Sequence, residues 1–166
     1  MENYFFEETQ KFRQIWLWII LSIAVLSNVV VAYFAISEIW SKNLSSMTIL
    51  SLFLSVSIPL SILLLFYFTK LETRIDKTGI YYRLFPFNIR LKNIKPENIK
   101  NYEIKRYSPL GDYGGWGIRY GGRKGKAYNI SGNIGIFFEL DNRRKLLIGT
   151  QLPEELASAM KILLNK

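Results

Sequence analysis

Two long uncharged stretches stand out in the pattern of hydrophobic and polar positions along the chain. Residues 14–37 and 43–69 carry no charged side chain. Each stretch contains a 22-residue apolar segment, 15–36 and 47–68, which as a helix extends about 33 Å and can cross a hydrocarbon core of about 30 Å. The pattern therefore predicts a transmembrane hairpin, with helices over 15–36 and 47–69 and an external loop over 37–46.

Two other interpretations of the apolar segments are a buried core helix and, for the first segment, a cleavable signal peptide. Two neighbouring uncharged stretches, each longer than about 18 residues, favour membrane spans over core helices. A signal peptide has a basic start and a shorter apolar region, whereas this chain begins with Glu2, Glu7 and Glu8. A retained hairpin therefore accounts best for the pattern.

Basic residues flank the predicted hairpin unevenly. The loop 37–46 holds only Lys42, whereas the outer flanks hold Lys11, Arg13, Lys70, Arg74 and Lys77. Lys and Arg near span ends stay preferentially on the cytoplasmic side. We therefore expect a multi-pass protein of the inner (cytoplasmic) membrane, with the N-terminal segment 1–14 and the domain 70–166 both in the cytoplasm.

The predicted spans contain polar side chains but no Asp, Glu, Lys, Arg or His. A transporter or pump is disfavoured, because proton relays and ion-coupling sites need such residues. Ser51/Ser55 and Ser57/Ser61 form small-x-x-x-small pairs, which let helix backbones approach closely. Their neighbour could be the other helix of the hairpin, a second copy of the chain or another membrane protein.

From residue 70 onward the pattern changes to short strands separated by turn residues. Leu71, Thr73 and Ile75 alternate with charged residues, and 76–79 is typical of a hairpin turn. Further strands are expected at 80–85, 87–91, 99–107, 116–120, 127–131, 134–140 and 145–150, with a Gly-rich loop at 108–115. A helix is expected from about Pro153, because apolar residues follow at helical spacing.

Several segments of this region carry a resemblance to a known group of proteins. They read YGGWGIR at 113–119, GKAYNISG at 125–132, LIGTQ at 147–151 and PEEL at 153–156. With its strand order and final helix, the chain resembles uncharacterised bacterial membrane proteins with a two-helix transmembrane hairpin followed by a pleckstrin-homology-like (PH-like) domain. The resemblance implies an α+β membrane protein in which 70–166 form a split β-barrel of about seven strands, capped by a C-terminal helix. It implies no activity.

The predicted soluble domain is also the basic part of the chain. It holds 19 of the 22 Lys and Arg residues and 9 of the 13 Asp and Glu residues. The chain has no Cys and no His, which removes thiolate nucleophiles, disulfides, the commonest metal ligand and the commonest general base. Outside the first hairpin, the 95–98 turn and the helix cap, only Glu139 and Asp141 have a spacing that could place two carboxylates on one strand face, and Asp141 belongs to a hairpin turn. We therefore expect a protein that is not an enzyme and that needs no metal and no cofactor.

Basic residues interleaved with aromatic ones form the candidate binding site. Its members are Lys105, Arg106, Trp116, Arg119, Arg123, Lys124 and Lys126. Three interpretations compete: a solvated surface, contact with anionic lipid headgroups, and nucleic-acid binding. The last is disfavoured, because the chain has neither an RNA-recognition aromatic signature nor a helix-turn-helix.

These observations lead to two expectations for function. The first is a non-enzymatic, membrane-anchored binding or scaffold protein that docks a protein partner or anionic headgroups at the cytoplasmic face. The alternative is an accessory subunit of a larger membrane complex, or a homo-oligomer, that makes its contacts through the hairpin.

Overall fold

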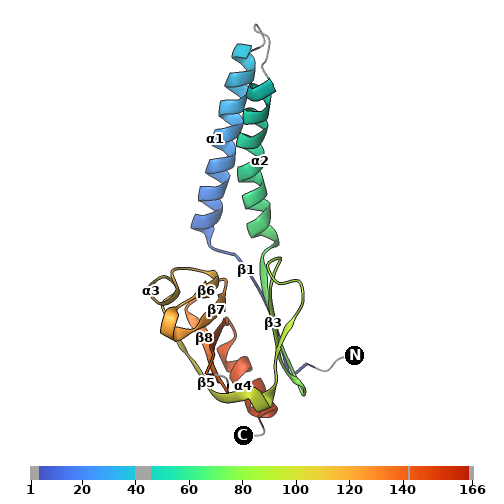
Figure 1. Ribbon diagram of the computed structural model, residues 1–166, viewed down its shortest axis with the longest axis vertical. Helices are drawn as coiled ribbons and strands as arrows, with labels where there is room; N and C mark the ends of the chain where they lie inside the picture. Colours follow the sequence, from blue (N-terminus) through green and yellow to red (C-terminus); the bar gives the residue numbers. More distant parts are fainter. Residues whose placement is uncertain (1–3, 40–45, 142, 165–166) are drawn as a thin grey trace. The chain divides into compact units, whose positions relative to one another are not determined.

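The computed structural model describes residues 4–39, 46–141 and 143–164. These residues form two units, one made of 13–68 and the other of the N-terminal residues up to Phe12 together with the chain from Thr69 onward. Figure 1 shows the order of the elements along the chain.

The first unit is a pair of helices, α1 (Ile15–Ile39) and α2 (Ser46–Phe68). Both are long and apolar enough to cross a membrane, and almost none of their side chains are buried. They pack against each other, with an edge-on contact between the rings of Trp18 and Tyr67. The two predicted helices are confirmed, and their exposed apolar surface indicates membrane association. The expected loop 37–46 is wrong at its ends, because residues 37–39 belong to α1 and Ser46 to α2, and residues 40–45 lie outside the described residues.

Polar side chains within the two helices bond to their own helix. The hydroxyl groups of Ser51, Ser55 and Ser61 donate to carbonyls three or four residues earlier, at 2.9, 2.8 and 2.7 Å. The Asn28 amide donates to the Ala24 carbonyl at 2.7 Å. These side chains are therefore satisfied without a partner chain.

The second unit begins with a strand that the sequence analysis did not predict. β1 (Phe6–Lys11) pairs antiparallel with β2 (Lys70–Asp76), from Phe6 opposite Ile75 to Lys11 opposite Lys70. Its buried positions are Phe6, Glu8 and Gln10, so its inward face is mostly polar and lacks the apolar alternation of a strand. The helical hairpin is thus inserted between two paired strands of one domain.

β1 and β2 continue into a four-stranded sheet, sheet A, in the order β1-β2-β3-β4. β3 (Gly79–Phe85) follows the predicted turn, in which the Asp76 carboxylate accepts hydrogen bonds from the backbone of Thr78 and Gly79. The strand expected at 87–91 is wrong. That segment is a loop, because the Asn88 N–H bonds back to the Leu84 carbonyl, and β4 is formed by Lys92–Ile94.

The remaining strands form a second sheet, sheet B, in the order β5-β8-β9-β7-β6. They are β5 (Ile99–Arg106), β6 (Gly117–Tyr120), β7 (Lys126–Asn129), β8 (Ile134–Leu140) and β9 (Lys145–Gly149). β7 and β9 are parallel, unlike every other pair. Short 3-10 turns, η1 (Pro96–Asn98) and η2 (Gly122–Lys124), precede β5 and β7.

Part of the expected Gly-rich loop 108–115 is helical. α3 (Pro109–Tyr113) is capped by Ser108, whose hydroxyl accepts from the Gly111 N–H at 3.0 Å, and the backbone N–H of Ser108 donates to Asp112. This reciprocal capping stabilises a helical turn in spite of the glycine.

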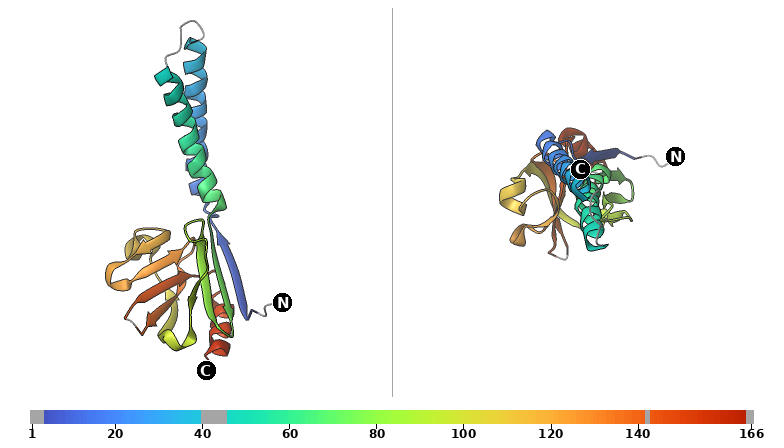
Figure 2. Two further views of the ribbon diagram at one scale, coloured as in Figure 1. Left: turned by 45° about the vertical axis from the view of Figure 1, so that its right-hand side comes forward. Right: turned by 90° about the horizontal axis from the view of Figure 1, so that it is seen from above.

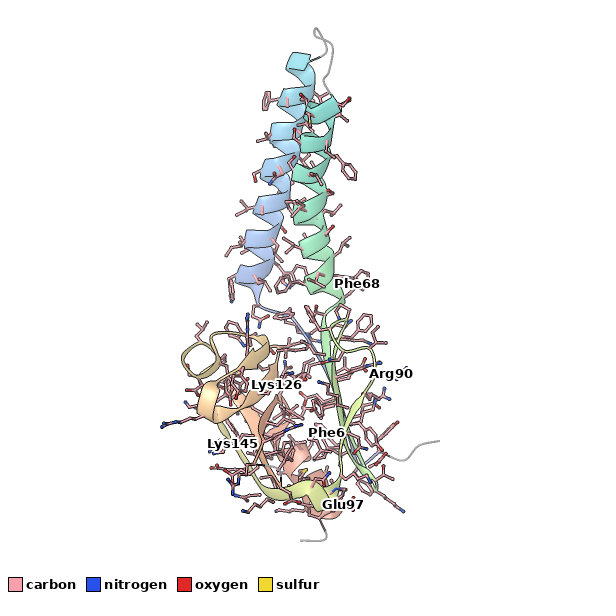
Figure 3. All side chains as sticks on the ribbon, in the orientation of Figure 1. Phe6, Phe68, Arg90, Glu97, Lys126 and Lys145 are labelled. Atoms are coloured by element: carbon pink, nitrogen blue, oxygen red, sulfur yellow. The ribbon has the colours of Figure 1, made fainter. Side chains whose placement is uncertain are left out.

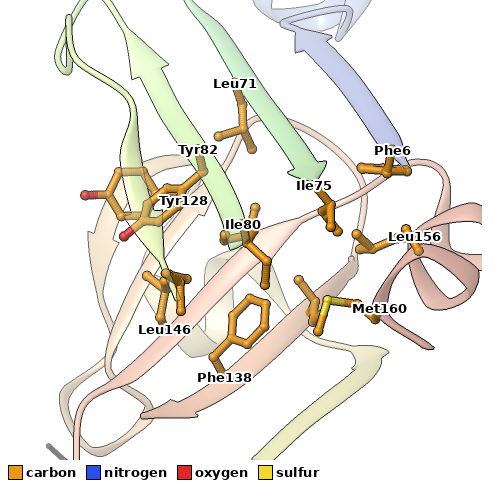
Figure 4. Close-up of a cluster of buried hydrophobic side chains, with 14 of the residues drawn as sticks. Phe6, Leu71, Ile75, Ile80, Tyr82, Tyr128, Phe138, Leu146, Leu156 and Met160 are labelled. Carbon is orange, nitrogen blue, oxygen red and sulfur yellow. The ribbon is translucent and has the colours of Figure 1, made fainter. Parts of the chain in front are cut away.

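The core lies between the two sheets, and the C-terminal helix α4 (Pro153–Leu163) packs against β1 and β2 (Figure 2). Figure 4 shows side chains of both sheets and of α4 converging, among them Ile80, Phe138 and Met160. The α+β class and the helix beginning at Pro153 are confirmed. In place of a barrel of about seven strands, the described chain has nine strands in two open sheets.

Polar contacts attach β1 to the end of sheet B. The Glu8 carboxylate accepts from the Thr150 hydroxyl and the Gln151 N–H, both at 2.7 Å, and the Gln10 amide donates to the Gly149 carbonyl at 2.7 Å. Burial raises the pKa of the Glu8 carboxyl and outweighs the opposite effect of these hydrogen bonds. A buried carboxyl therefore takes part in holding the first strand.

We expect Glu8 to give the domain a pH-dependent stability. Because its folded-state pKa is raised, the stability that it contributes is fully present below its ordinary pKa of 4.5 and is lost as the pH rises through the folded-state value. The thermal midpoint of the full chain in detergent, relative to that of Glu8→Gln, should rise as the pH is lowered from about 8 to about 5. The exposed control Glu97→Gln should follow the wild type, and parallel curves for wild type and Glu8→Gln would contradict this assignment.

Candidate functional site

The structure divides the predicted site residues among three places on sheet B. Lys105 and Arg106 end β5, and Arg123, Lys124 and Lys126 lie in η2 and at the start of β7. Arg119 lies in β6 and Trp116 directly precedes this strand. The Arg119 guanidinium donates to the Trp116 carbonyl at 2.9 Å. Apart from Trp116, which is partly buried, all of these residues are exposed.

One hollow, of about 390 Å³, collects four of the predicted residues: Lys105, Arg106, Arg123 and Lys124. We call it the mixed-charge hollow, because carboxylates line it as well. Ion pairs join Lys105 to Glu103 at 2.5 Å, Lys124 to Asp112 at 2.5 Å and Lys145 to Glu139 at 3.3 Å. The hydrogen bond from Lys124 lowers the pKa of Asp112. Much of the positive charge here is thus compensated internally.

A second hollow, of about 550 Å³, has a different character, and we call it the basic hollow. Its charged lining residues are Arg123, Lys126, Arg143, Arg144 and Lys145, and its lining includes no acidic side chain. Tyr120, 76% exposed, is also one of its lining residues. Figure 3 shows Lys126 and Lys145 on the same side of the domain, over sheet B. Cations gathered without carboxylates favour an anionic ligand.

A close backbone approach shapes the basic hollow. A Cβ atom added at Gly125 would lie 2.1 Å from the carbonyl oxygen of Lys145, and Gly125 has a φ of +80°. Only glycine fits this position without moving the backbone. Gly125 therefore allows η2 and the start of β9, with their basic side chains, to lie side by side.

Sequence reasoning found only Arg123 and Lys126 of the basic hollow's cations. Lys145 begins the strand expected at 145–150 and Arg143 and Arg144 directly precede it, and these three consecutive basic residues are a visible signal in the sequence. They meet Lys126 because β7 runs parallel to β9, with Lys126 opposite Leu146. Trp116 and Arg119 line neither hollow.

Among the described residues, no three Asp or Glu side chains are grouped so as to hold a metal ion. Burial raises the pKa of the tyrosines Tyr82, Tyr107 and Tyr113, that of Tyr113 to about 12. Their hydroxyls are therefore harder to ionise than that of an ordinary tyrosine.

Comparison with known proteins gives a match at the level of a family. No curated protein and no protein of solved structure matches it. Residues 2–163, which include both long helices and nearly all of the second unit, match the model of a family described as a family of unknown function (DUF6141). The chain therefore belongs to this family of unknown function, DUF6141.

Proposed function

We propose that this protein is a non-enzymatic binding module, anchored by its helical hairpin in the inner (cytoplasmic) membrane, that holds an anionic partner in its basic hollow. The observation that carries the proposal is the lining of that hollow, which holds five cations and no acidic side chain, although one of the five, Lys145, also pairs with Glu139. The partner is either an anionic lipid headgroup or an acidic segment of a protein. The mixed-charge hollow supports the proposal less, because its ion pairs already satisfy three of its cations.

The pairing of β1 with β2 supports the proposal that the two flanks of the hairpin lie on the same side of the membrane. β1 precedes α1 and β2 follows α2, and the two strands pair over six residues of each. If both helices span the bilayer, both strands are on the same side of it. The distribution of Lys and Arg favours the cytoplasmic side.

A relationship to bacterial PH-like domains remains part of this proposal. Two sheets enclosing one core, with a C-terminal helix packed against them, agree with it. The parallel pairing of β7 with β9 and the strand before the hairpin depart from the expected pattern.

The alternative of an accessory subunit that binds through its hairpin is less well supported, because several polar side chains of the helices bond to their own backbone. Replacing residues 13–68 by an unrelated two-helix hairpin distinguishes the two functions. Retained partner binding supports the basic hollow, and lost binding supports contact through the native hairpin. Such a graft must keep residues 4–12, because β1 belongs to the soluble domain.

Fluorescence in lipid nanodiscs tests the proposal. The chain has no cysteine, so Tyr120→Cys allows a single environment-sensitive dye to be attached at the margin of the basic hollow. With a headgroup-spin-labelled lipid as quencher, quenching should increase with the fraction of phosphatidylglycerol if the partner is a headgroup. If the partner is a protein, an acidic peptide should change the emission instead.

Charge-neutralising variants provide the control for this experiment. Lys126→Gln/Arg143→Gln/Arg144→Gln should abolish either response. Lys77→Gln/Lys100→Gln/Lys161→Gln changes the net charge equally at exposed sites outside the hollow and should respond like the wild type. A dye that responds to neither phosphatidylglycerol nor the acidic peptide would contradict the proposed function.

A further inference from the structure

The loop between β3 and β4, residues 86–91, displays large apolar side chains to solvent. Phe87 is 58% exposed, Ile89 72% and Leu91 36%. Arg90 lies between the last two and is also exposed (Figure 3). Single exposed apolar residues are ordinary, but three of them within five positions are typical of a surface that contacts a partner or a membrane.

Hydrogen bonds hold this loop in its exposed position. The Asn88 N–H donates to the Leu84 carbonyl at 2.7 Å, and the Arg83 guanidinium donates to the Ile89 carbonyl at 2.9 Å. Arg83 is itself fixed by an ion pair with the buried carboxylate of Glu72 at 2.6 Å. Although burial acts to raise the pKa of Glu72, its bonds to Arg83 and Lys70 lower it overall, so this carboxylate is ionised at neutral pH. The apolar side chains are therefore presented by an anchored loop.

Chain connectivity brings the loop to the end of sheet A at which the chain leaves the hairpin. α2 ends at Phe68, and Lys70, two residues later, pairs with Phe85, the last residue before the loop. The path from Phe68 to Phe87 runs two residues along the chain to Lys70, across one strand spacing to Phe85, and two residues further along the chain. These steps add up to at most about 20 Å between the Cα atoms of Phe68 and Phe87. If α2 spans the bilayer, the loop begins within reach of the bilayer surface.

The two ends of sheet A differ in chemistry. At the end connected to the hairpin, the β3–β4 loop carries Phe87, Ile89 and Leu91. At the opposite end, the β2–β3 turn exposes only Lys77 and Thr78, and the Thr78 hydroxyl bonds to Asp76. The apolar side chains thus lie at the end of sheet A that is connected to the hairpin.

We propose that loop 86–91 inserts Phe87, Ile89 and Leu91 into the interfacial region of the bilayer, with the Arg90 guanidinium at the lipid phosphates. This inference rests on the membrane anchoring in the proposed function. Apolar side chains beside a basic one suit the boundary between acyl chains and headgroups, where the apolar groups leave water and the cation meets phosphate. The loop would then be a contact with lipid that restrains the rotation of the soluble domain on its hairpin.

A dye placed on the loop tests the inference in full-length protein. Ile89→Cys, labelled with an environment-sensitive dye in nanodiscs of phosphatidylcholine alone, should emit at shorter wavelength and be quenched by lipid spin-labelled near the top of its acyl chain. The same dye at Lys77→Cys, in the opposite turn, should show neither effect. Equal quenching at the two positions, or none at Ile89→Cys in protein that is incorporated into discs, would overturn the inference.

Two further variants separate this contact from anion binding. Phe87→Ser/Leu91→Ser, added to Ile89→Cys, should markedly reduce the quenching, while a thermal midpoint close to that of the single variant shows that the domain is folded. Lys126→Gln/Arg143→Gln/Arg144→Gln should leave the quenching unchanged, because the discs carry no net charge; a loss of quenching in that variant would overturn an apolar contact. Failure of the proposed anion binding would appear only as an unresponsive dye at Tyr120→Cys.

Discussion

Removal of residues 1–11 should unfold the soluble domain, although these residues lie on the other side of the hairpin in sequence. The deletion removes β1, exposes the edge of β2 and strips the core of Phe6. It also leaves Thr150 and Gly149 without their bonds to Glu8 and Gln10. We expect a loss of at least about 5 kcal/mol, comparable to the whole stability of a small domain. Limited proteolysis detects this unfolding as faster cleavage within the chain that follows Thr69.

A matched chain without the hairpin completes this test. Lys11 and Lys70 are paired, so a Gly/Ser linker of about four residues can replace 13–68 without straining the sheet. This chain should fold as a soluble, protease-resistant domain, whereas the chain from Thr69 onward alone should not. Equal protease resistance of the two would show that β1 is dispensable.

Gly125→Ala should be among the most damaging single substitutions. The added methyl group would meet the backbone of Lys145, and the positive φ of Gly125 adds strain. We expect a loss of about 3 kcal/mol or more, and a fall in thermal midpoint of roughly 12 °C or more for a domain of this size. The substitution should also abolish the anion response of the basic hollow, because it separates η2 from β9.

Gly122→Ala is the control for this substitution. Gly122 also has a positive φ, of +56°, but nothing lies within 4 Å of an added Cβ atom. Its cost should be limited to the conformational strain, about 1 kcal/mol. Similar thermal midpoints for the two variants would contradict a close approach between Gly125 and Lys145.

The hairpin and most strands were predictable from sequence because their signals are local. The two uncharged stretches predict α1 and α2, and the turn residues at 76–79 predict the pairing of β2 with β3. β1 was missed because its buried side chains Glu8 and Gln10 form hydrogen bonds with residues more than 130 positions away. In a sequence, a buried polar residue whose partner lies far along the chain cannot be distinguished from an exposed polar residue.

The candidate site was predictable only in part, for a similar reason. The composition identified sheet B as basic, but it could not separate the hollow that carboxylates also line, where Lys105 and Lys124 are paired, from the hollow whose charged lining is entirely basic. That distinction depends on the parallel pairing of β7 with β9 and on the close approach at Gly125. Neither leaves a local pattern in the sequence.

The most direct test of the central claim, that the basic hollow holds an anionic partner at the membrane, is a comparison of complexes extracted from native membranes. The wild type, Lys126→Gln/Arg143→Gln/Arg144→Gln and Lys77→Gln/Lys100→Gln/Lys161→Gln are purified in a mild detergent, and the proteins and lipids in fixed ratio to each are identified by mass spectrometry. An anionic lipid or an acidic protein should accompany the wild type and the second triple variant and be absent from the first. Identical components in all three would contradict the claim.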